Sequence, residues 1–100
     1  MPAKNVTIAD VRAVLAKNIR RFRKQKSKIE RRRLSQEAAA HEVGIDRTML
    51  SKIETCKTNP SLETLFKLAS YFDVGIADLL SGDENSLSDE GARTGAVPDS

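Results

Sequence analysis

The sequence predicts an all-α fold class, and three observations lead to this prediction. Apolar residues recur at the spacing of an amphipathic helix in several segments. Segment 36–43 is rich in Ala, the best helix former. Helix caps stand where helices should begin and end, with Ser35 before this segment and Gly44 after it. The chain has 100 residues, which is enough for one small domain.

The first predicted helix begins after Thr7, and Asp10 three residues later forms an acidic capping box with it. The helix should run to about Gln25 and continue by a turn or more, toward a loop at 30–32. Residues 7–14 are expected to pack on the domain's own core or on a second subunit, and residues 1–6 to be frayed. The apolar face of this helix is expected to comprise Ile8, Val11, Val14 or Leu15, Asn18, Ile19 and Phe22.

Two short helices joined by a tight turn are predicted at 36–43 and 47–55, with Asp46 as the N-cap of the second one. On a helical wheel, one arc of the second helix is apolar. The opposite arc combines cations with short hydroxyls and has no acid, and it comprises Arg47, Thr48, Ser51, Lys52 and Thr55. Such a face suits the acceptor-rich base edges of the DNA major groove and the flanking phosphates. The spacing alone also fits an ordinary corner between two helices.

A fourth helix is predicted at 62–72, with Ser61 as its N-cap and Asp73 at the turn that follows. Its buried stripe is expected to comprise Leu62, Leu65, Phe66, Leu68, Ala69 and Phe72. Gly75 then opens a short fifth helix at 76–80. We expect one domain over residues 7–81, followed by an acidic disordered tail over 82–100, which has too few apolar residues to order itself.

The formal net charge of +3 hides a segregation of charge along the chain. Segment 17–33 holds ten Lys and Arg residues against one Glu, whereas residues 81–100 hold five acids and one base. A basic domain with an acidic tail indicates a polyanionic partner. One Cys and one His leave no internal disulfide and no metal cluster. Without a long apolar run or a signal peptide, we expect no membrane span and a cytoplasmic protein.

Two segments, LSQEAAAHEVGIDRTMLSKIE and NPSLETLFKLASYFDVGIADLL, resemble the helix-turn-helix domain of phage Cro and CI-type repressors, the XRE family. The resemblance covers about two-thirds of the chain. It implies a five-helix lambda-repressor-like DNA-binding domain, with the helix-turn-helix in helices 2 and 3 and an extended first helix. The start of the third helix, residues 46–48, is also similar to controller proteins of restriction–modification systems. The family's motif elements are Leu34-Ser35-Gln36-Glu37, Gly44, Ser51-Lys52-Ile53-Glu54 and Asn59-Pro60-Ser61.

Residues and resemblance together predict a sequence-specific regulator of transcription, a repressor, that reads the major groove of double-stranded DNA with helix 47–55. The resemblance implies a homodimer on a palindromic operator. Its dimer surface is expected at Ile76 and Leu79 or at the extra N-terminal turns. The single His41 has only distant Ser and Asp residues with which to form a catalytic triad, so we predict no catalytic residue. We also predict no metal, no cofactor and no small-molecule ligand. The alternative is an antitoxin or other protein-interaction regulator whose acidic tail binds a partner protein.

The predicted DNA contacts fall into three groups. Arg47, Thr48, Ser51 and Lys52 are expected at base edges. The residues expected to hold the backbone are Gln36, which also buttresses Arg47, and Thr55, Lys57 and Asn59. The basic segment 24–33 is about six residues longer than in the family, and its loop is either solvated or in contact with phosphates through Arg31, Arg32 and Arg33.

The resemblance also implies two structural features near the third helix. Arg23 is expected to pair with Glu54 at the border between the core arc and the groove arc, which would hold the third helix against the first. Cys56 stands where the family usually has Gly, so a left-handed backbone there would cost on the order of 1 kcal/mol.

Overall fold

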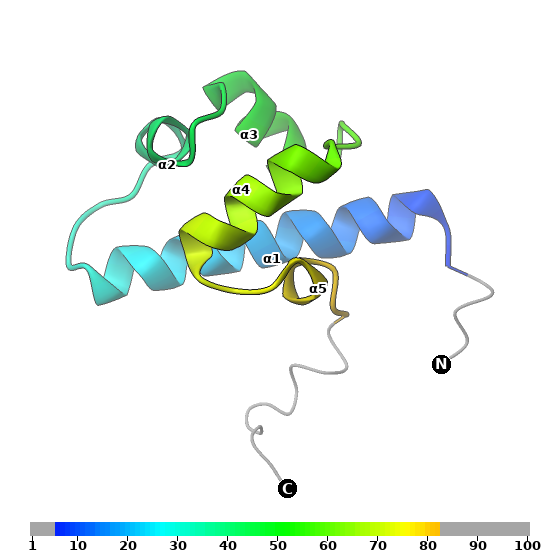
Figure 1. Cartoon of the computed structure of the whole chain (residues 1–100), viewed down its shortest axis with the longest axis horizontal. Coiled ribbons are helices and arrows are strands. Elements are labelled where there is room, and N and C mark those ends of the chain that lie inside the picture. Colours follow the sequence, from blue (N-terminus) through cyan, green and yellow to red (C-terminus); the bar gives the residue numbers. More distant parts are fainter. Residues whose placement is uncertain (1–5, 83–100) are drawn as a thin grey trace, which may run out of the picture.

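The computed structural model describes residues 6–82, and within this range the regular structure is entirely α-helical (Figure 1). The predicted fold class is thereby confirmed. The ranges 1–5 and 83–100, which include most of the predicted frayed N-terminus and acidic tail, lie outside the described residues. The helices are α1 (Ile8–Ile29), α2 (Gln36–Val43), α3 (Arg47–Glu54), α4 (Leu62–Phe72) and α5 (Ile76–Leu79).

Helix α1 is 22 residues long, and α3, α4 and α5 pack along it, whereas α2 packs on α3 and α4 (Figure 1). Its N-terminus is closed by the predicted capping box, in which the Thr7 hydroxyl accepts from the Asp10 amide at 3.2 Å and the Asp10 carboxylate accepts from the Thr7 amide at 3.0 Å. The predicted continuation beyond Gln25 is confirmed, since the helix ends at Ile29. Ile8 was expected on the buried face but is 57% exposed, because the first turns of α1 extend past the other helices.

The core lies where α1, α3, α4 and α5 meet, and α2 closes it with two small residues, Ala39 and Ala40. Buried Asn18 on α1 is its main polar member. The Asn18 side-chain amide donates to the Leu79 carbonyl at 2.8 Å and to the Ser81 carbonyl at 3.0 Å. These carbonyls at the end of α5 have no helical partner of their own, so Asn18 both satisfies them and holds α5 on α1. The largest fully buried apolar side chains are Ile19, Leu50, Ile53, Leu68 and Leu79.

Two predictions about apolar side chains in the C-terminal half are wrong. Leu62 and Phe66 were placed in the buried stripe of α4, but they are 72% and 62% exposed. They lie one turn apart on a side of α4 that no other described helix covers. Leu79 was considered for a dimer surface, but it is fully buried in the monomer. Its helix packs on both α1 and α4, which leaves this side chain no access to a second subunit.

Left-handed backbone occurs at the three positions that the sequence suggested, 44, 56 and 73, and also at Arg31. Gly44 ends α2 with φ 94°, and Asp73 ends α4 with φ 58°. Cys56, just beyond α3, has φ 64° and therefore carries a β-carbon in a conformation that favours Gly. Arg31 in the loop after α1 has φ 55°.

We expect Cys56→Gly to raise the free energy of unfolding by about 0.5–1 kcal/mol, because relief of the left-handed strain exceeds the extra chain entropy that Gly loses on folding. Urea denaturation followed by circular dichroism measures the change. Cys56→Ala is the matched control, since it removes the thiol and keeps the β-carbon. Equal stabilisation by Ala and Gly would contradict backbone strain as the cause.

Candidate nucleic-acid interface

Helices α2 and α3 meet through a three-residue turn at 44–46. The Ser35 hydroxyl accepts from the Ala38 amide at 3.1 Å and caps α2 as predicted. Asp46 stands at the N-cap position of α3 with extended backbone, but its side chain makes no capping hydrogen bond, so that part of the prediction is wrong. The apolar arc of α3 holds this helix on the core, since Leu50 and Ile53 are almost completely buried.

The opposite face of α3 points to solvent with the residues expected at base edges. Arg47, Thr48 and Lys52 are exposed, and Ser51 is half-buried. Thr55 is exposed just beyond the helix, and its hydroxyl donates to the Ser51 carbonyl at 2.7 Å. The one acid of α3, Glu54, turns inward. The exposed face of the helix therefore carries donors and positive charge and no carboxylate.

Glu54 is the centre of a buried polar cluster, and the predicted ion pair with Arg23 is confirmed. The Arg23 Nε donates to Glu54 Oε2 at 2.9 Å, and its Nη2 donates to Oε1 at 2.9 Å. The Gln36 amide donates to the same Oε1 at 2.9 Å. The pair is not at the border of the core as expected, because Glu54 is only 3% exposed. The prediction that Gln36 buttresses Arg47 is also wrong, since its amide is directed to Glu54.

Helix α1 also holds the two chain segments next to this cluster. The Arg20 guanidinium donates to the backbone carbonyl of Glu54 at 2.6 Å, where the last carbonyls of α3 lack helical partners. Arg23 Nη1 donates to the Leu34 carbonyl at 3.0 Å, just before α2. The role of Arg20 was missed in the sequence. The available signal was its position one turn before Arg23, which places both side chains toward α3.

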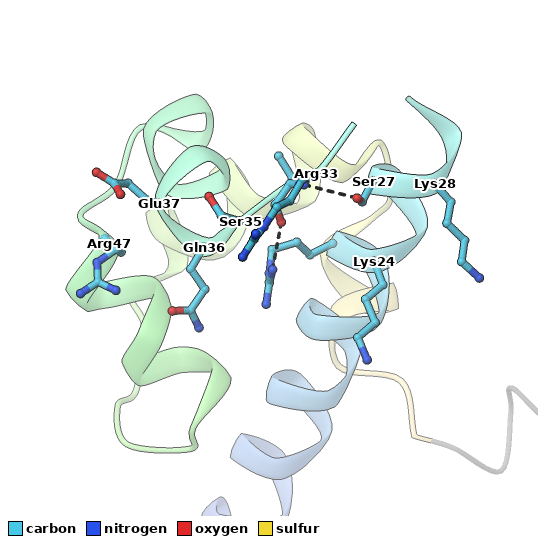
Figure 2. A pocket seen from close by; sticks show the side chains of 10 residues that line it. Lys24, Ser27, Lys28, Arg33, Ser35, Gln36, Glu37 and Arg47 are labelled. Carbon is cyan, nitrogen blue, oxygen red and sulfur yellow. Dashed lines mark hydrogen bonds between the residues drawn. The ribbon is translucent and has the colours of Figure 1, made fainter. Parts of the chain in front are cut away.

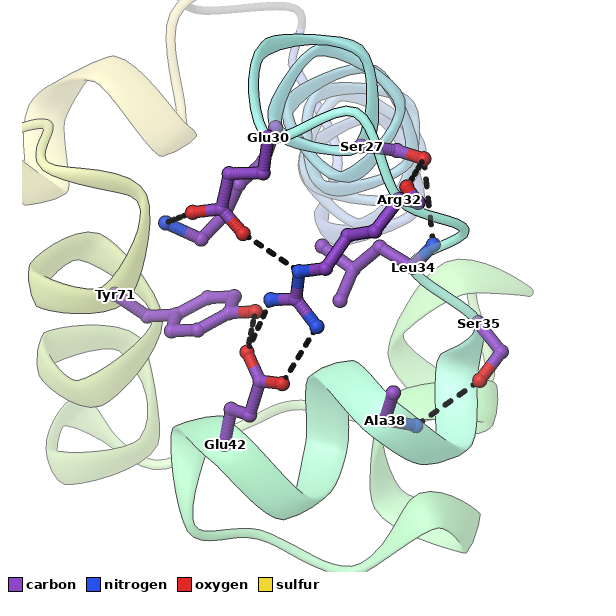
Figure 3. Close-up of polar contacts among 9 residues, drawn as sticks. Ser27, Glu30, Arg32, Leu34, Ser35, Ala38, Glu42 and Tyr71 are labelled. Carbon is purple, nitrogen blue, oxygen red and sulfur yellow. Dashed lines mark hydrogen bonds and ion pairs between the residues drawn. The ribbon is translucent and has the colours of Figure 1, made fainter.

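The arginines of the basic loop separate into different environments. Arg32 turns toward α2 and α4, where its Nε donates to Glu30 at 2.8 Å and its two terminal nitrogens donate to Glu42 at 2.8 and 2.7 Å (Figure 3). Its guanidinium is thus already bound by two carboxylates, and Arg32 is not among the residues that we assign to the interface. Arg31 is exposed, and Arg33 lies beside α2.

The carboxylate of Glu42 also accepts a hydrogen bond from the Tyr71 hydroxyl at 2.7 Å (Figure 3). The hydrogen bonds from Arg32 and Tyr71 lower the pKa of Glu42 to about 2. The pKa of Tyr71 is raised to about 12, mainly by partial burial and secondly by the hydrogen bond to Glu42. Both groups keep one protonation state over the physiological range, so this cluster acts as a fixed brace between the loop, α2 and α4.

An open pocket of about 600 Å³ lies between the C-terminal half of α1 and the N-terminal ends of α2 and α3 (Figure 2). Glu37 is the sole acid among its described lining residues. Lys24 and Lys28 were not singled out from the sequence, although their spacing of four on one helix places them on one face. The cations that line the pocket are Arg23, Lys24, Lys28, Arg33 and Arg47.

Two predicted backbone contacts lie at the opposite end of α3. Lys57 and Asn59 are both exposed in the loop before α4. The Asn59 side-chain oxygen accepts from Arg12 Nε at 2.6 Å, which ties this loop to α1.

Within residues 6–82, no cluster of His, Cys, Asp and Glu has the composition of a metal site. None of the described helices has the length and apolar character of a membrane span.

Comparisons with known proteins agree with this geometry. The helix-turn-helix family HTH_3 matches residues 19–79. A hypothetical transcription factor from Neisseria meningitidis serogroup B is 38% identical over 80 residues, which are 80% of this chain and 70% of the relative. The crystal structure of a hypothetical transcription factor from Neisseria superposes with a TM-score of 0.70 at 35% identity, over 88% of this chain and 94% of that chain. The restriction-modification controller protein C.AhdI from Aeromonas hydrophila superposes with a TM-score of 0.60 at 28% identity, over 71% of this chain and 94% of that chain.

The fold and the matches define a helix-turn-helix regulator of transcription, which is not an enzyme. The chain belongs to the helix-turn-helix family HTH_3. The predicted likeness to the XRE family and the lambda-repressor-like arrangement of five helices are confirmed. The similarity to restriction–modification controller proteins, predicted from residues 46–48, is also confirmed.

We expect Glu54→Ala to lower the free energy of unfolding by about 3 kcal/mol, because it leaves the largely buried Arg23 guanidinium and the Gln36 amide without their acceptor. Chemical denaturation measures the loss. Glu42→Ala is the control, since it removes a carboxylate that also accepts from an Arg but is solvent-accessible, and its effect should be clearly smaller. Equal losses in the two variants would contradict the central role of Glu54.

Proposed function

We propose that this protein binds double-stranded DNA in a sequence-specific manner and regulates transcription, with α3 lying in the major groove. The acid-free exposed face of α3 carries this proposal, together with the buried Glu54 cluster that holds the helix in place. A groove-reading helix must present donors and positive charge at a fixed angle to the backbone contacts. The regulator class of the family and the names of its relatives support the same function.

Each polar residue of the interface has a proposed role. Arg47 and Lys52 donate to guanine O6 and N7, and Thr48 and Ser51 contact neighbouring base edges. The DNA backbone is held at two ends of the reading helix. At one end the contacts come from Gln36 and Arg33, which line the pocket beside α2. At the other end they come from Thr55, Lys57 and Asn59, which are exposed after α3.

We further propose that the protein acts as a homodimeric repressor on a palindromic operator in the cytoplasm. The resemblance to Cro and CI-type repressors supports a palindromic operator and repression of transcription. The exposed pair Leu62 and Phe66 on α4 supports a second copy of the chain as the partner, because large apolar side chains one turn apart gain most from mutual burial. This α4 surface replaces Leu79, which is buried, as the proposed dimer contact.

Selection of bound sequences from a random duplex pool tests the DNA proposal, and Arg47→Ala tests its mechanism. We expect this variant to lose about 1–3 kcal/mol of binding free energy on the selected site and to relax specificity at one base pair. Lys67→Ala removes one charge from α4 as the control. If Arg47→Ala weakened specific and non-specific binding equally, its assignment to a base edge would be wrong.

The dimer proposal predicts that Phe66→Glu produces a monomer. A charge buried in the interface should raise the dimer dissociation constant by more than about tenfold, which is 1.4 kcal/mol. Sedimentation equilibrium without DNA should then give the chain mass of 11.0 kDa rather than twice this value. Ile29→Glu is the matched control, because Ile29 is 79% exposed at the far end of α1. A dimeric Phe66→Glu variant would exclude this surface.

A further inference from the structure

Whether a cation on or near α1 has a carboxylate partner depends on the side of the helix on which it lies. On the side of α4, Lys26 pairs with Glu30 at 3.0 Å, and Arg32 binds both Glu30 and Glu42. On the side of the pocket, the side chains of Lys24, Lys28 and Arg33 have no hydrogen bond or ion pair with any residue in the range 6–82. The fold thus uses its acids to neutralise one side and leaves positive charge uncompensated on the other.

The three uncompensated cations share one surface. Lys24 and Lys28 are exposed and lie one turn apart on α1, and Arg33 lines the same pocket from the loop before α2. In Figure 2 the side chains of Lys24 and Gln36 extend to the same side of the domain, with Arg33 between them. Three like charges around one open pocket repel each other, and an anion placed among them relieves this repulsion.

The basic surface continues beyond this pocket in two directions. Arg47 at the start of α3 lines it at one end, next to the proposed reading face. At the other end, Lys24 and Lys28 also border a second hollow of about 390 Å³ along α1, together with Lys17, Arg20 and Arg21. A single small anion would occupy only a part of such a path, whereas a chain of phosphates can follow it.

We propose that Lys24 and Lys28 form a second binding site for the phosphodiester backbone, outside the helix-turn-helix itself and continuous with the backbone contact proposed for Arg33. The proposal rests on the proposed DNA binding by α3. A strand that leaves the groove beside Arg47 passes Gln36 and then reaches the two lysines on α1. Lys28 lies in the last turn of α1, so the long α1 lengthens the contact with DNA. This site adds affinity without reading sequence, because phosphates are the same at every base pair.

The first test compares two double variants with the same net charge. Lys24→Gln/Lys28→Gln removes the proposed contacts, and Lys26→Gln/Lys67→Gln removes one charge on α1 and one on α4 that both already have carboxylate partners. For the first variant we expect the slope of log K against log salt to become shallower by about 1.8, which reduces the loss of affinity between 50 and 200 mM salt by about tenfold. The control should keep the wild-type slope.

A second test locates the contact on the DNA. Neutral methylphosphonate linkages are placed one at a time along the selected duplex, and the affinity of each duplex is measured. A linkage position that Gln36 contacts is one where the methylphosphonate weakens binding of the wild type but not of Gln36→Ala. For the wild type we expect a second set of sensitive positions next to these. In Lys24→Gln/Lys28→Gln this second set should no longer weaken binding, whereas the positions contacted by Gln36 should still do so.

The outcomes separate this inference from the proposed function. If the wild type selects no sequence, the DNA proposal itself fails. If it selects a sequence but Lys24→Gln/Lys28→Gln keeps the wild-type slope and the full pattern of sensitive linkages, only the second site is wrong. NMR signals of the two lysine side chains provide the third readout. Shifts caused by inorganic phosphate but not by duplex, at equal ionic strength, would assign the pocket to a small anion and overturn the inference.

Discussion

The buried carboxylate of Glu54 is the constraint on which the arrangement of the other elements depends. A buried charge is tolerated only with an opposite charge and hydrogen bonds to its oxygens, and here these come from Arg23 on α1 and Gln36 on α2. Three helices must therefore hold their relative positions for one group to be satisfied. Arg20 adds a bond to the end of α3. The reading helix is thus attached to the rest of the domain through polar groups as well as through its apolar arc.

The positions of the carboxylates also determine the charge of the surface. On the side of α4, Glu30 and Glu42 bind Arg32 (Figure 3), and Glu30 also pairs with Lys26. Glu54 is turned into the core. Few carboxylates remain near the N-terminal ends of α2 and α3, and the pocket there is lined mostly by cations (Figure 2). Positive potential on this side therefore arises from where the acids are placed and not only from the number of bases.

Much of the fold was predictable because helix ends depend on local chemistry. Thr7, Ser35 and Ser61 offer hydroxyls to unpaired amides, and Gly44 adopts a backbone that other residues avoid. These signals act within one turn of the chain, so they are legible without knowledge of the neighbours. The donor-rich face of α3 was predictable for a related reason, since the angular position of a side chain on a helix follows from its number alone. The link between Arg23 and Glu54 came instead from the resemblance to a family.

By itself, then, the sequence determined the five helices, the N-terminal caps of α1, α2 and α4 and the polar face of α3, because each depends on residues a few positions apart. Only the tertiary structure decided which side chains on those helices meet. Leu62 and Phe66 have the spacing of core residues, yet no helix covers them, whereas Leu79 is buried between α1 and α4. Arg32 and Arg33 are neighbours in one basic run, but only Arg32 meets Glu42. Burial and ion pairing depend on segments distant in the chain, whose approach no local pattern specifies.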